Sequence, residues 1–351
     1  MTVHLWVRAE QRPHEERVGV TPEGVAALIA AGIRVSVEES SVRAIPVDGY
    51  RAAGAEIVAE NSWPDAPKDA IVFGLKELPD DGTPLPHRHI MFGHAFKGQP
   101  AGQVLLRRFK AGGGTLYDLE YLVDGTGRRV AAFGYWAGFA GAALSLKCWA
   151  AQQRGTICGP VSVYASRAAL VADLQAELAG LSRPRALIIG ALGRVGTGAA
   201  DCLTAMGVGV TRWDMAETAS GGPFPQVLQH EIFLNCILAR PGCPVFVPAS
   251  AKVDPARKLT VIGDIACDPT SDFSPIKVYD RATDWDAPAL RVAGDPPLDV
   301  TAIDNLPSLM PVESSQDYAA QLLPSLLTLT DLSSGVWGRA KADYDTHSAN
   351  L

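Results

Sequence analysis

Residues 185–203 read RALIIGALGRVGTGAADCL, and GVTRWD follows at residues 209–214. RALIIG is a continuous apolar run, which is typical of a parallel strand that is covered on both faces. Glycines recur at short spacing after it, at Gly190, Gly193, Gly196 and Gly198. They favour a tight turn into a helix, and GVTRWD has the pattern of the next strand. This order of segments predicts a doubly wound α/β domain.

The glycine spacing is G-x-x-G-x-x-G, which departs from the strict G-x-G-x-x-G of dinucleotide-binding folds. Its context still favours a dinucleotide, because glycines let the main chain approach a pyrophosphate and a helix N-terminus attracts negative charge. Asp214 lies 18 residues after Gly196, where a carboxylate can bind an adenosine ribose and disfavour a 2′-phosphate. Arg194 and Arg212 weaken that preference. The pattern predicts NAD binding, and the alternative is a tight turn without a ligand.

The rest of the chain also alternates strand-like and helix-like segments. Strands are expected at HLWVRA, IRVSVEE, DAIVFGLKE, HIMFGHAFK and TLYDLEYL, and later at EIFLNCIL, KLTVIGDIA and KVYD. Helices are expected between them, including a long one at residues 133–154, another at residues 164–180, and more in the tail from about residue 310. This alternation predicts two doubly wound parallel-sheet domains with a cleft between them.

Composition narrows the possible classes of protein. The 351 residues include 31 Lys and Arg against 38 Asp and Glu, a formal net charge of -7, which argues against a general nucleic-acid binder. The six cysteines form no C-x-x-C pair, so no metal site is expected. The first residues lack the pattern of a signal peptide, which favours a cytoplasmic protein with reduced thiols. The uncharged run at residues 130–146 is rich in Gly and Ala, and predicts a buried helix rather than a membrane span.

Two titratable residues end apolar strands in the first half of the chain, Lys76 after IVFGL and His94 after IMFG. Ligands of parallel sheets bind at the carboxyl ends of strands, so both side chains are expected at one mouth. An amine beside apolar residues can act as a base near neutral pH, and an imidazole exchanges protons there readily. The alternatives are a surface lysine paired with Glu77 and a hydrogen-bonded core histidine.

Cationic residues also gather near the expected strand ends. Arg17 precedes the helix start at Thr21, and its guanidinium could hold a carboxylate through two hydrogen bonds. Lys97, Arg128 and Arg129 add positive charge. On an acidic chain this local cluster predicts a small anionic substrate, and the alternative for Arg128 is a solvated face.

A further group follows the apolar strand KLTVIG and consists of Asp264, Cys267 and Asp268. Their place at a carboxyl end predicts that they lie near the nicotinamide of a bound NAD. The alternative is a turn that is simply rich in aspartate.

A series of motifs carries a family resemblance. In order, these are R-A-E at residues 8–10, E-R-V-G-V-T-P at 16–22, G-L-K-E at 74–77, G-H-A-F-K at 93–97, L-Y-D-L-E at 116–120, G-R-R-V-A-A-F-G at 127–134 and W-D-M-A-E-T at 213–218, then G-G-P-F, N-C-I and I-D-N-L-P-S-L. The series resembles the NAD-dependent, lysine-forming saccharopine dehydrogenases of fungal lysine biosynthesis, across nearly the whole chain. More distantly, Arg17, Lys76, His94 and Asp264 are similar to the pattern of alanine dehydrogenase.

The resemblance implies two Rossmann-like domains. Residues 1–132 with 312–351 would form the substrate domain, and residues 133–311 the NAD domain. The implied reaction oxidises saccharopine with NAD and water to L-lysine, 2-oxoglutarate and NADH. Lys76 would be the base that deprotonates the secondary amine, and His94 the acid and base of imine hydrolysis.

Matching the motifs position by position also implies ligand contacts. The substrate would contact Arg17, Lys76, Gln99, Arg129, Phe133, Ala266, Cys267 and Asp268. The cofactor would contact Arg128, Gly193, Arg194, Asp214, Thr218, Leu238, Ile265, Ile303, Asp304, Asn305 and Leu306.

Three positions depart from the family pattern. Asn305 stands where we expect a histidine, Leu238 where we expect an aromatic residue, and Val195 where we expect a cysteine. Two other functions therefore stay open. One is an alanine dehydrogenase-like or opine-type enzyme that acts on a different amine, and the other is an NAD-binding module without catalysis.

Overall fold

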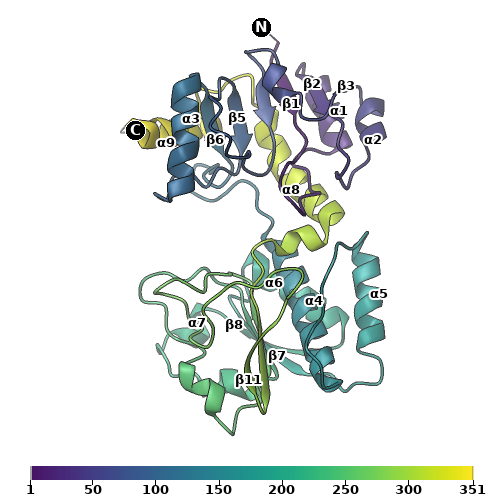
Figure 1. Cartoon of the computed structure of the whole chain (residues 1–351), viewed down its shortest axis with the longest axis vertical. Coiled ribbons are helices and arrows are strands. Elements are labelled where there is room, and N and C mark those ends of the chain that lie inside the picture. Colours follow the sequence, from purple (N-terminus) through teal and green to yellow (C-terminus); the bar gives the residue numbers. More distant parts are fainter. Residues whose placement is uncertain (1, 350) are drawn as a thin grey trace. The chain divides into compact units, whose positions relative to one another are not determined.

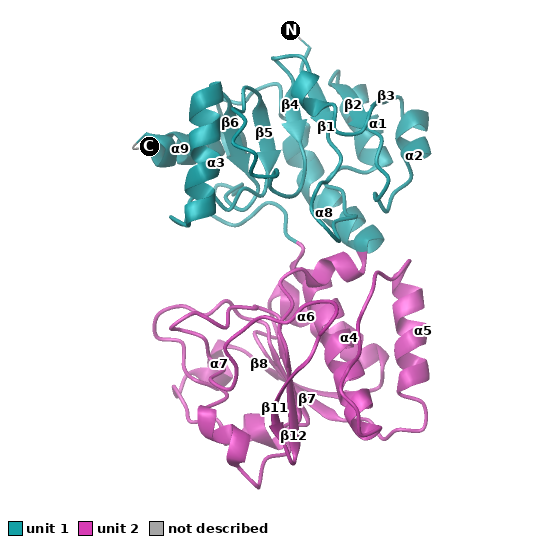
Figure 2. Cartoon of the chain, in the orientation of Figure 1, with its two compact units in different colours: residues 1–132, 311–351 teal, residues 133–310 magenta. Residues whose placement is uncertain are grey.

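The computed structural model describes residues 2–349 and 351, and the chain divides into two compact units. Unit 1 runs to Ala132 and resumes at Pro311, and unit 2 spans Phe133–Met310 (Figure 2). The second boundary lies one residue before the expected one. Pro311 opens the helix α8, and α8 packs against α1 in unit 1.

Unit 1 is built on a six-stranded sheet in the order β3-β2-β1-β4-β5-β6, and every pairing in it is parallel. Its strands are β1 (His4–Val7), β2 (Arg34–Glu38), β3 (Glu56–Val58), β4 (Ile71–Phe73), β5 (Arg88–Met91) and β6 (Thr115–Asp118). Its helices are α1 (Pro22–Ala30), α2 (Val47–Ala52), η1 (Trp63–Asp65), α3 (Pro100–Gly112), α8 (Pro311–Leu326) and α9 (Gly335–Ser348). The strand order reverses beside β1, and such a switch point is the usual ligand site of an open α/β sheet.

Local sequence fixes the start of α1, and packing on β6 fixes the place of the C-terminal tail. Thr21 caps α1 by accepting the main-chain N–H of Gly24 (3.3 Å), and Pro22 is its first residue. The tail belongs to this unit because the buried Trp337 of α9 packs edge-on against Tyr117 of β6, with ring centroids 5.8 Å apart. Figure 1 shows α3 and α9 beside β6, and α1 and α2 beside β2 and β3.

Unit 2 holds a second six-stranded sheet in the order β11-β12-β10-β9-β7-β8. Its strands are β7 (Arg185–Ile189), β8 (Gly209–Trp213), β9 (Ile232–Asn235), β10 (Val261–Asp264), β11 (Leu290–Gly294) and β12 (Pro297–Thr301). Its helices are α4 (Gly134–Gln153), α5 (Arg167–Glu177), α6 (Arg194–Ala205), α7 (Met215–Thr218), η2 (Pro225–Gln229), η3 (Ala249–Val253) and η4 (Leu306–Leu309).

The expected strand KVYD at residues 277–280 is wrong. In this region only Ile276 makes a single bridge, to Val247, and the sheet is completed instead by β11 and β12. These two strands pair antiparallel, because a short turn joins them directly and leaves no room for a crossover helix. The sheet of unit 2 is therefore mostly parallel rather than wholly so.

Two helices of unit 2 meet main chain to main chain. A side chain on Gly138 of α4 would come within 1.8 Å of the Val195 carbonyl, and one on Gly198 of α6 within 1.9 Å of the Tyr135 carbonyl. Only glycine allows this approach. The apolar run at residues 130–146 thus forms most of a buried helix that supports the start of α6. Among the described residues, no helix has both the length and the apolarity to cross a membrane.

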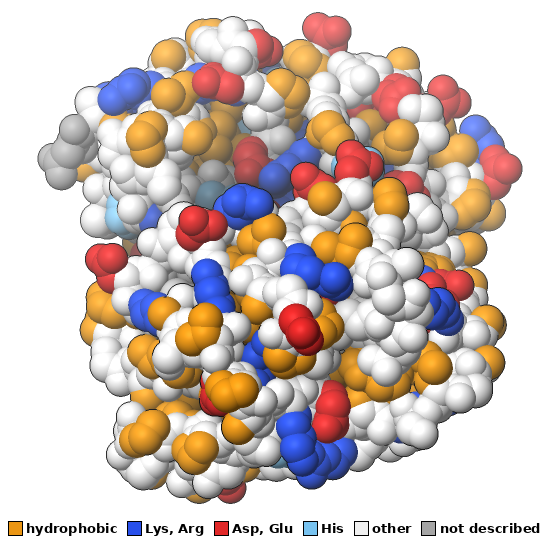
Figure 3. All heavy atoms as spheres, turned by 60° about the horizontal axis from the view of Figure 1, so that its bottom comes forward, with side chains coloured by type: hydrophobic (Ala, Val, Ile, Leu, Met, Phe, Trp, Pro, Cys, Tyr) orange, Lys and Arg blue, Asp and Glu red, His pale blue; other side chains and the backbone are white. Residues whose placement is uncertain are grey.

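Charge is not gathered into one region on the face drawn in Figure 3. Lysine and arginine side chains lie there among acidic and apolar ones, with no continuous basic stripe.

Candidate active site

The candidate catalytic residues of unit 1 follow neighbouring strands. Lys76 comes after β4 and His94 after β5, and these two strands pair directly. The segments stay linked beyond the strands, because the Phe92 N–H donates to the Leu75 carbonyl (2.8 Å). Each residue lies three positions beyond the last residue of its strand, Phe73 or Met91, rather than at the strand end itself. The shared mouth and the catalytic roles stay predictions.

The amine of Lys76 is partly buried among charged groups of both signs, the cations Arg17 and Arg12 and the anions Glu15 and Glu77. Burial lowers the pKa of Lys76, and the nearby charge of Arg17 lowers it further. Both effects disfavour the ammonium form. A lysine in this setting is neutral more often than an exposed one, which is what a base requires.

Arg17 is held by a carboxylate that the sequence did not single out. Its Nε and Nη2 donate to the two oxygens of Glu15, at 2.7 and 2.6 Å, and both residues are buried. Burial alone would raise the pKa of Glu15, but the ion pair with Arg17 outweighs burial and the pKa is lowered. A substrate carboxylate would therefore share the Arg17 guanidinium with Glu15.

His94 is held by a second carboxylate that sequence reasoning missed, Glu120. The ionised Glu120 accepts from His94 Nδ1 (2.8 Å) on one oxygen and from Lys97 Nζ (2.7 Å) on the other. The hydrogen bond to Glu120 raises the pKa of His94, and the same bond does most to lower the pKa of Glu120 to about 2. Because Nδ1 is engaged, Nε2 is the nitrogen through which His94 can exchange a proton.

A surface hollow of about 340 Å³ in unit 1 is lined by His94 and by Gln99, the residue just before α3. The structure thus brings together one expected catalytic residue and one expected substrate residue. The volume suits part of a small molecule.

The buried Tyr318 of α8 is influenced by the charges of two expected substrate residues. Burial raises the pKa of its hydroxyl, while the charges of Arg129 and Arg17 both act to lower it. Arg129 itself is exposed in a short loop, next to the exposed Arg128. Tyr318 was not predicted, because it comes from the distant C-terminal tail.

The glycine turn of unit 2 joins β7 to α6. Gly190 has a positive φ of 79°, and a side chain on Gly196 would come within 2.2 Å of the Gly190 carbonyl. At Gly193, by contrast, a side chain would meet only that carbonyl, at 3.5 Å, so one side of the turn is open. Arg194 follows as the first residue of α6. An open glycine before a helix N-terminus fits a pyrophosphate, because the first N–H groups of a helix lack helical acceptors.

Asp214 follows β8 and lies beside this turn. Its carboxylate accepts the Leu192 N–H (3.1 Å) and the Met215 N–H (2.9 Å), and it caps α7. A carboxylate can accept about four hydrogen bonds, which leaves capacity for ribose hydroxyls. Leu192 and Met215, whose main-chain N–H groups bind this carboxylate, have apolar side chains that are 80% and 82% exposed. Neither was predicted, although apolar groups suit an adenine face.

Comparison with known proteins decides the family. Over 361 aligned residues the chain is 46% identical to a Neurospora crassa protein, covering 99% of this chain and 97% of that one. A Schizosaccharomyces pombe protein is 44% identical, with 98% of each chain covered. Both are named saccharopine dehydrogenase (NAD+, L-lysine-forming). The chain belongs to this saccharopine dehydrogenase family.

Two further comparisons describe its architecture. Residues 6–140 match the family described as alanine dehydrogenase/PNT, N-terminal domain. An L-alanine dehydrogenase structure superposes with a TM-score of 0.70 at 18% identity over 99% of each chain. A transhydrogenase from Sinorhizobium meliloti superposes with a TM-score of 0.62 at 16% identity, covering 94% of this chain and 95% of that one. The predicted α/β class with two Rossmann-like sheets is confirmed.

The residues after β10, which the saccharopine dehydrogenase resemblance assigned to ligands, sit in a strained loop. Cys267 has a φ of 50°, and its thiol donates to the Ala302 carbonyl (3.1 Å). Burial raises the pKa of Cys267 to about 12, so the thiol stays protonated. Ala266 and Asp268 flank it, and Asp264 before it is buried and accepts from Asn235 (2.9 Å) and Tyr279 (2.5 Å). The loop is thus anchored from both sides.

The other positions expected at the cofactor differ in exposure. Ile303 and Leu306 are 3% and 2% exposed and belong to the core of unit 2, so only their main chain can reach a ligand. Asp304 is exposed, Asn305 is partly buried, and Leu238 is 68% exposed.

Three further residues complete the expected sites. Ile265 packs against α4, where a side chain on Gly141 would come within 2.6 Å of it. Thr218 ends α7 and donates to the Asp214 carbonyl (2.9 Å). Phe133 is the N-cap of α4 and belongs to unit 2. Among the residues that the structure describes, no group of three or more acidic, histidine or cysteine side chains could hold a metal ion.

Proposed function

We propose that this chain oxidises saccharopine with NAD and water, giving L-lysine, 2-oxoglutarate and NADH. The observation that carries the proposal is the 44–46% identity to saccharopine dehydrogenases over 98–99% of the chain. Similarity over such a length covers both the acid–base residues of unit 1 and the glycine turn of unit 2.

The residues proposed to hold NAD are Gly193, Arg194, Asp214 and Thr218. When bound, NAD supplies the acceptor for the hydride that leaves the substrate carbon. The open side at Gly193 and the spare acceptor capacity of Asp214 support this assignment. Further contacts to NAD are proposed for Leu238, Ile265, Ile303, Asp304, Asn305, Leu306 and Arg128.

Lys76 is proposed to take the proton of the secondary amine. Saccharopine can lose a hydride from its glutaryl carbon only if the adjacent nitrogen carries a lone pair. Burial and Arg17 lower the pKa of Lys76, which favours the neutral amine that can accept that proton.

His94 is proposed to serve imine hydrolysis. Water must lose a proton as it adds to the imine carbon, and the departing lysine nitrogen must gain one. An imidazole can do both in turn through Nε2, while Glu120 holds Nδ1. The hydrogen bond to Glu120 raises the pKa of His94, whereas burial lowers that of Lys76, so the two proton affinities are brought closer together.

The substrate carries three carboxylates, which calls for cationic and polar partners. Arg17, Arg129 and Gln99 are proposed to bind them, with Phe133, Ala266, Cys267 and Asp268 as further contacts. Support comes from the shared electrostatic influence of Arg17 and Arg129 on Tyr318, and from the hollow beside His94.

Formation of NADH from saccharopine tests the proposal against its rivals. Purified protein is mixed with NAD and either saccharopine or alanine, and NADH absorbance is followed. We expect NADH to form in the sample with saccharopine and not in the sample with alanine. NADH from alanine alone would indicate an alanine dehydrogenase-like enzyme. Thermal stabilisation by NAD without turnover of any amine would indicate a binding module.

A further inference from the structure

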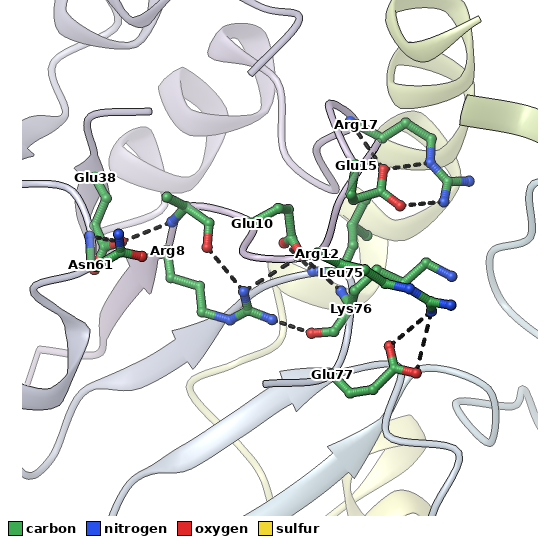
Figure 4. A network of polar contacts seen from close by, with 11 residues as sticks. Arg8, Glu10, Arg12, Glu15, Arg17, Glu38, Asn61, Leu75, Lys76 and Glu77 are labelled. Atoms are coloured by element: carbon green, nitrogen blue, oxygen red, sulfur yellow. Dashed lines mark hydrogen bonds and ion pairs between the residues drawn. The ribbon is translucent and has the colours of Figure 1, made fainter. Parts of the chain in front are cut away.

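Two side chains that follow β1 hold the main chain of Lys76 (Figure 4). Glu10 accepts the Leu75 N–H on one oxygen (2.6 Å) and the Lys76 N–H on the other (3.0 Å). Arg8 Nη2 donates to the Lys76 carbonyl. Both main-chain polar groups of Lys76 are thus bound by side chains of a different segment. Arg8 and Glu10 are called the main-chain clamp below.

The clamp is itself rigid. The Arg8 and Glu10 side chains are 0% and 8% exposed and lie 3.5 Å apart as an ion pair. Arg8 Nη1 also donates to the Ala9 carbonyl (2.9 Å), and the Ala9 N–H donates to the fully buried Glu38 (2.8 Å). Groups anchored in this way hold their partners in one geometry.

Gly74 shows how closely the clamp and the Lys76 segment are fitted. A side chain at Gly74 would come within 2.4 Å of the Arg8 guanidinium. Arg8 therefore crosses directly over the main chain of Gly74 to reach the Lys76 carbonyl. The R-A-E motif at residues 8–10 and the G-L-K segment at residues 74–76 form one structural element.

We propose that Arg8 and Glu10 are positioning residues for the reaction, which fix the main chain of Lys76 and thereby hold its amine in place beside Arg17. This inference rests on the proposed function, in which Lys76 is the base. In Figure 4 the Lys76 side chain extends away from the clamp, so Arg8 and Glu10 act through the main chain rather than at the reacting atoms. A displacement of about 1 Å can cost a reaction on the order of a hundredfold.

Loosening the clamp has a defined electrostatic consequence. Burial is the main reason that the pKa of Lys76 is lowered, so an amine that moves toward water regains a higher pKa. The charged groups that act on this amine are Arg17, Glu15, Arg12 and Glu77, and all four are unchanged in the variants below. Less of the amine is then neutral at a given pH, and the acid limb of the rate profile moves to higher pH.

The test compares Glu10→Gln and Arg8→Lys with a matched buried arginine, Arg257. Arg257 is 4% exposed and likewise donates to main-chain carbonyls, those of Pro296 (2.7 Å), Pro297 (3.1 Å) and Leu259, but it lies in unit 2 and has no proposed role. Arg257→Lys therefore shows how much Tm falls when a buried arginine that only holds main chain is replaced. Glu10→Gln keeps the size of the side chain but cannot accept both N–H groups, and it decides the test if Arg8→Lys does not fold.

Three quantities are measured for each variant: the pH dependence of kcat with saccharopine, the pKa of Lys76 from competitive acetylation read by mass spectrometry, and Tm. The clamp variants are expected to raise the Lys76 pKa and the acid limb by about 0.5–1 pH unit and to lower kcat about tenfold at neutral pH. Arg257→Lys should lower Tm alone. A fall in Tm with an unchanged Lys76 pKa and acid limb in Glu10→Gln would overturn the proposal.

Lys76→Met separates this inference from the proposed function. If Lys76→Met keeps its turnover of saccharopine, the proposed role of Lys76 fails, and with it the positioning role of the clamp in the reaction. The acetylation measurement on Glu10→Gln does not depend on turnover, so it still shows whether the clamp holds the amine.

Discussion

The two sheets reverse their strand order beside their first strand, β1 in unit 1 and β7 in unit 2, yet the chemistry that follows those strands differs. After β1 come the charged side chains Arg8 and Glu10, which hold the Lys76 segment. After β7 comes a glycine turn in which Gly193 leaves the main chain open. We propose that one scaffold carries side-chain acid–base chemistry in unit 1 and main-chain ligand binding in unit 2. The predictions below test this division.

The largest effect is expected for the two acid–base side chains. Lys76→Met and His94→Gln should each lower kcat by about 10²–10³, since each removes a proton acceptor. NAD affinity should change little, because both residues lie in unit 1 while the glycine turn lies in unit 2. Steady-state kinetics with saccharopine and fluorescence titration with NAD measure the two quantities. Unchanged turnover in both variants would remove these residues from the mechanism.

Asp214→Ala should weaken NAD binding while leaving kcat nearly unchanged. Loss of hydrogen bonds from ribose to an ionised acceptor should weaken NAD binding by about 1–3 kcal/mol. At saturating NAD, kcat should stay near its original value. The variant also removes the cap of α7, so Tm should be measured beside the NAD dissociation constant. A fall in kcat at saturating NAD, with unchanged NAD affinity, would show that Asp214 acts in the chemical step rather than in NAD binding.

The two glycines of the turn should separate binding from folding. Gly193→Ala has space within the protein and a φ of -76°, so Tm should hold while NAD affinity falls about tenfold through contact with the pyrophosphate. Gly196→Ala would press on the Gly190 carbonyl and should cost about 1–3 kcal/mol of stability. Thermal unfolding with and without NAD distinguishes them. Equal NAD affinity in Gly193→Ala and the parent protein would contradict main-chain binding at this turn.

The smallest effect concerns the partner of His94. Glu120→Gln removes the charge that stabilises the imidazolium, so the pKa of His94 should fall toward its ordinary value. NMR titration of the imidazole measures this directly. Because His94 must be neutral to accept a proton from water, the corresponding limb of the rate profile should move to lower pH. An unchanged His94 pKa would show that Glu120 does not set it.

Strand-end positions could be predicted from the sequence because they depend on local pattern. Lys76 and His94 each follow an apolar run, Asp214 follows the predicted strand GVTRW, and the carboxyl end of a strand is a fixed place in a parallel sheet. The glycine turn could likewise be predicted, because its glycines recur at short spacing after an apolar run.

Partners from other segments could not be predicted in the same way. Glu120 lies 26 residues from His94, and Tyr318 comes from the tail, so neither is marked by the pattern around the residue it serves. The β11–β12 hairpin is not evident from the sequence because Pro296 and Pro297 interrupt the strand pattern, whereas KVYD has a strand-like pattern without forming a strand. Burial of Ile303 and Leu306 also depends on packing that no local motif records.

Identification of the products tests the central claim most directly. Protein is incubated with saccharopine and NAD, and lysine, 2-oxoglutarate and NADH are quantified from the same sample. We expect the three products in equal amounts. Lys76→Met should form them at no more than about one hundredth of the parent rate. NADH that forms without matching lysine would contradict it.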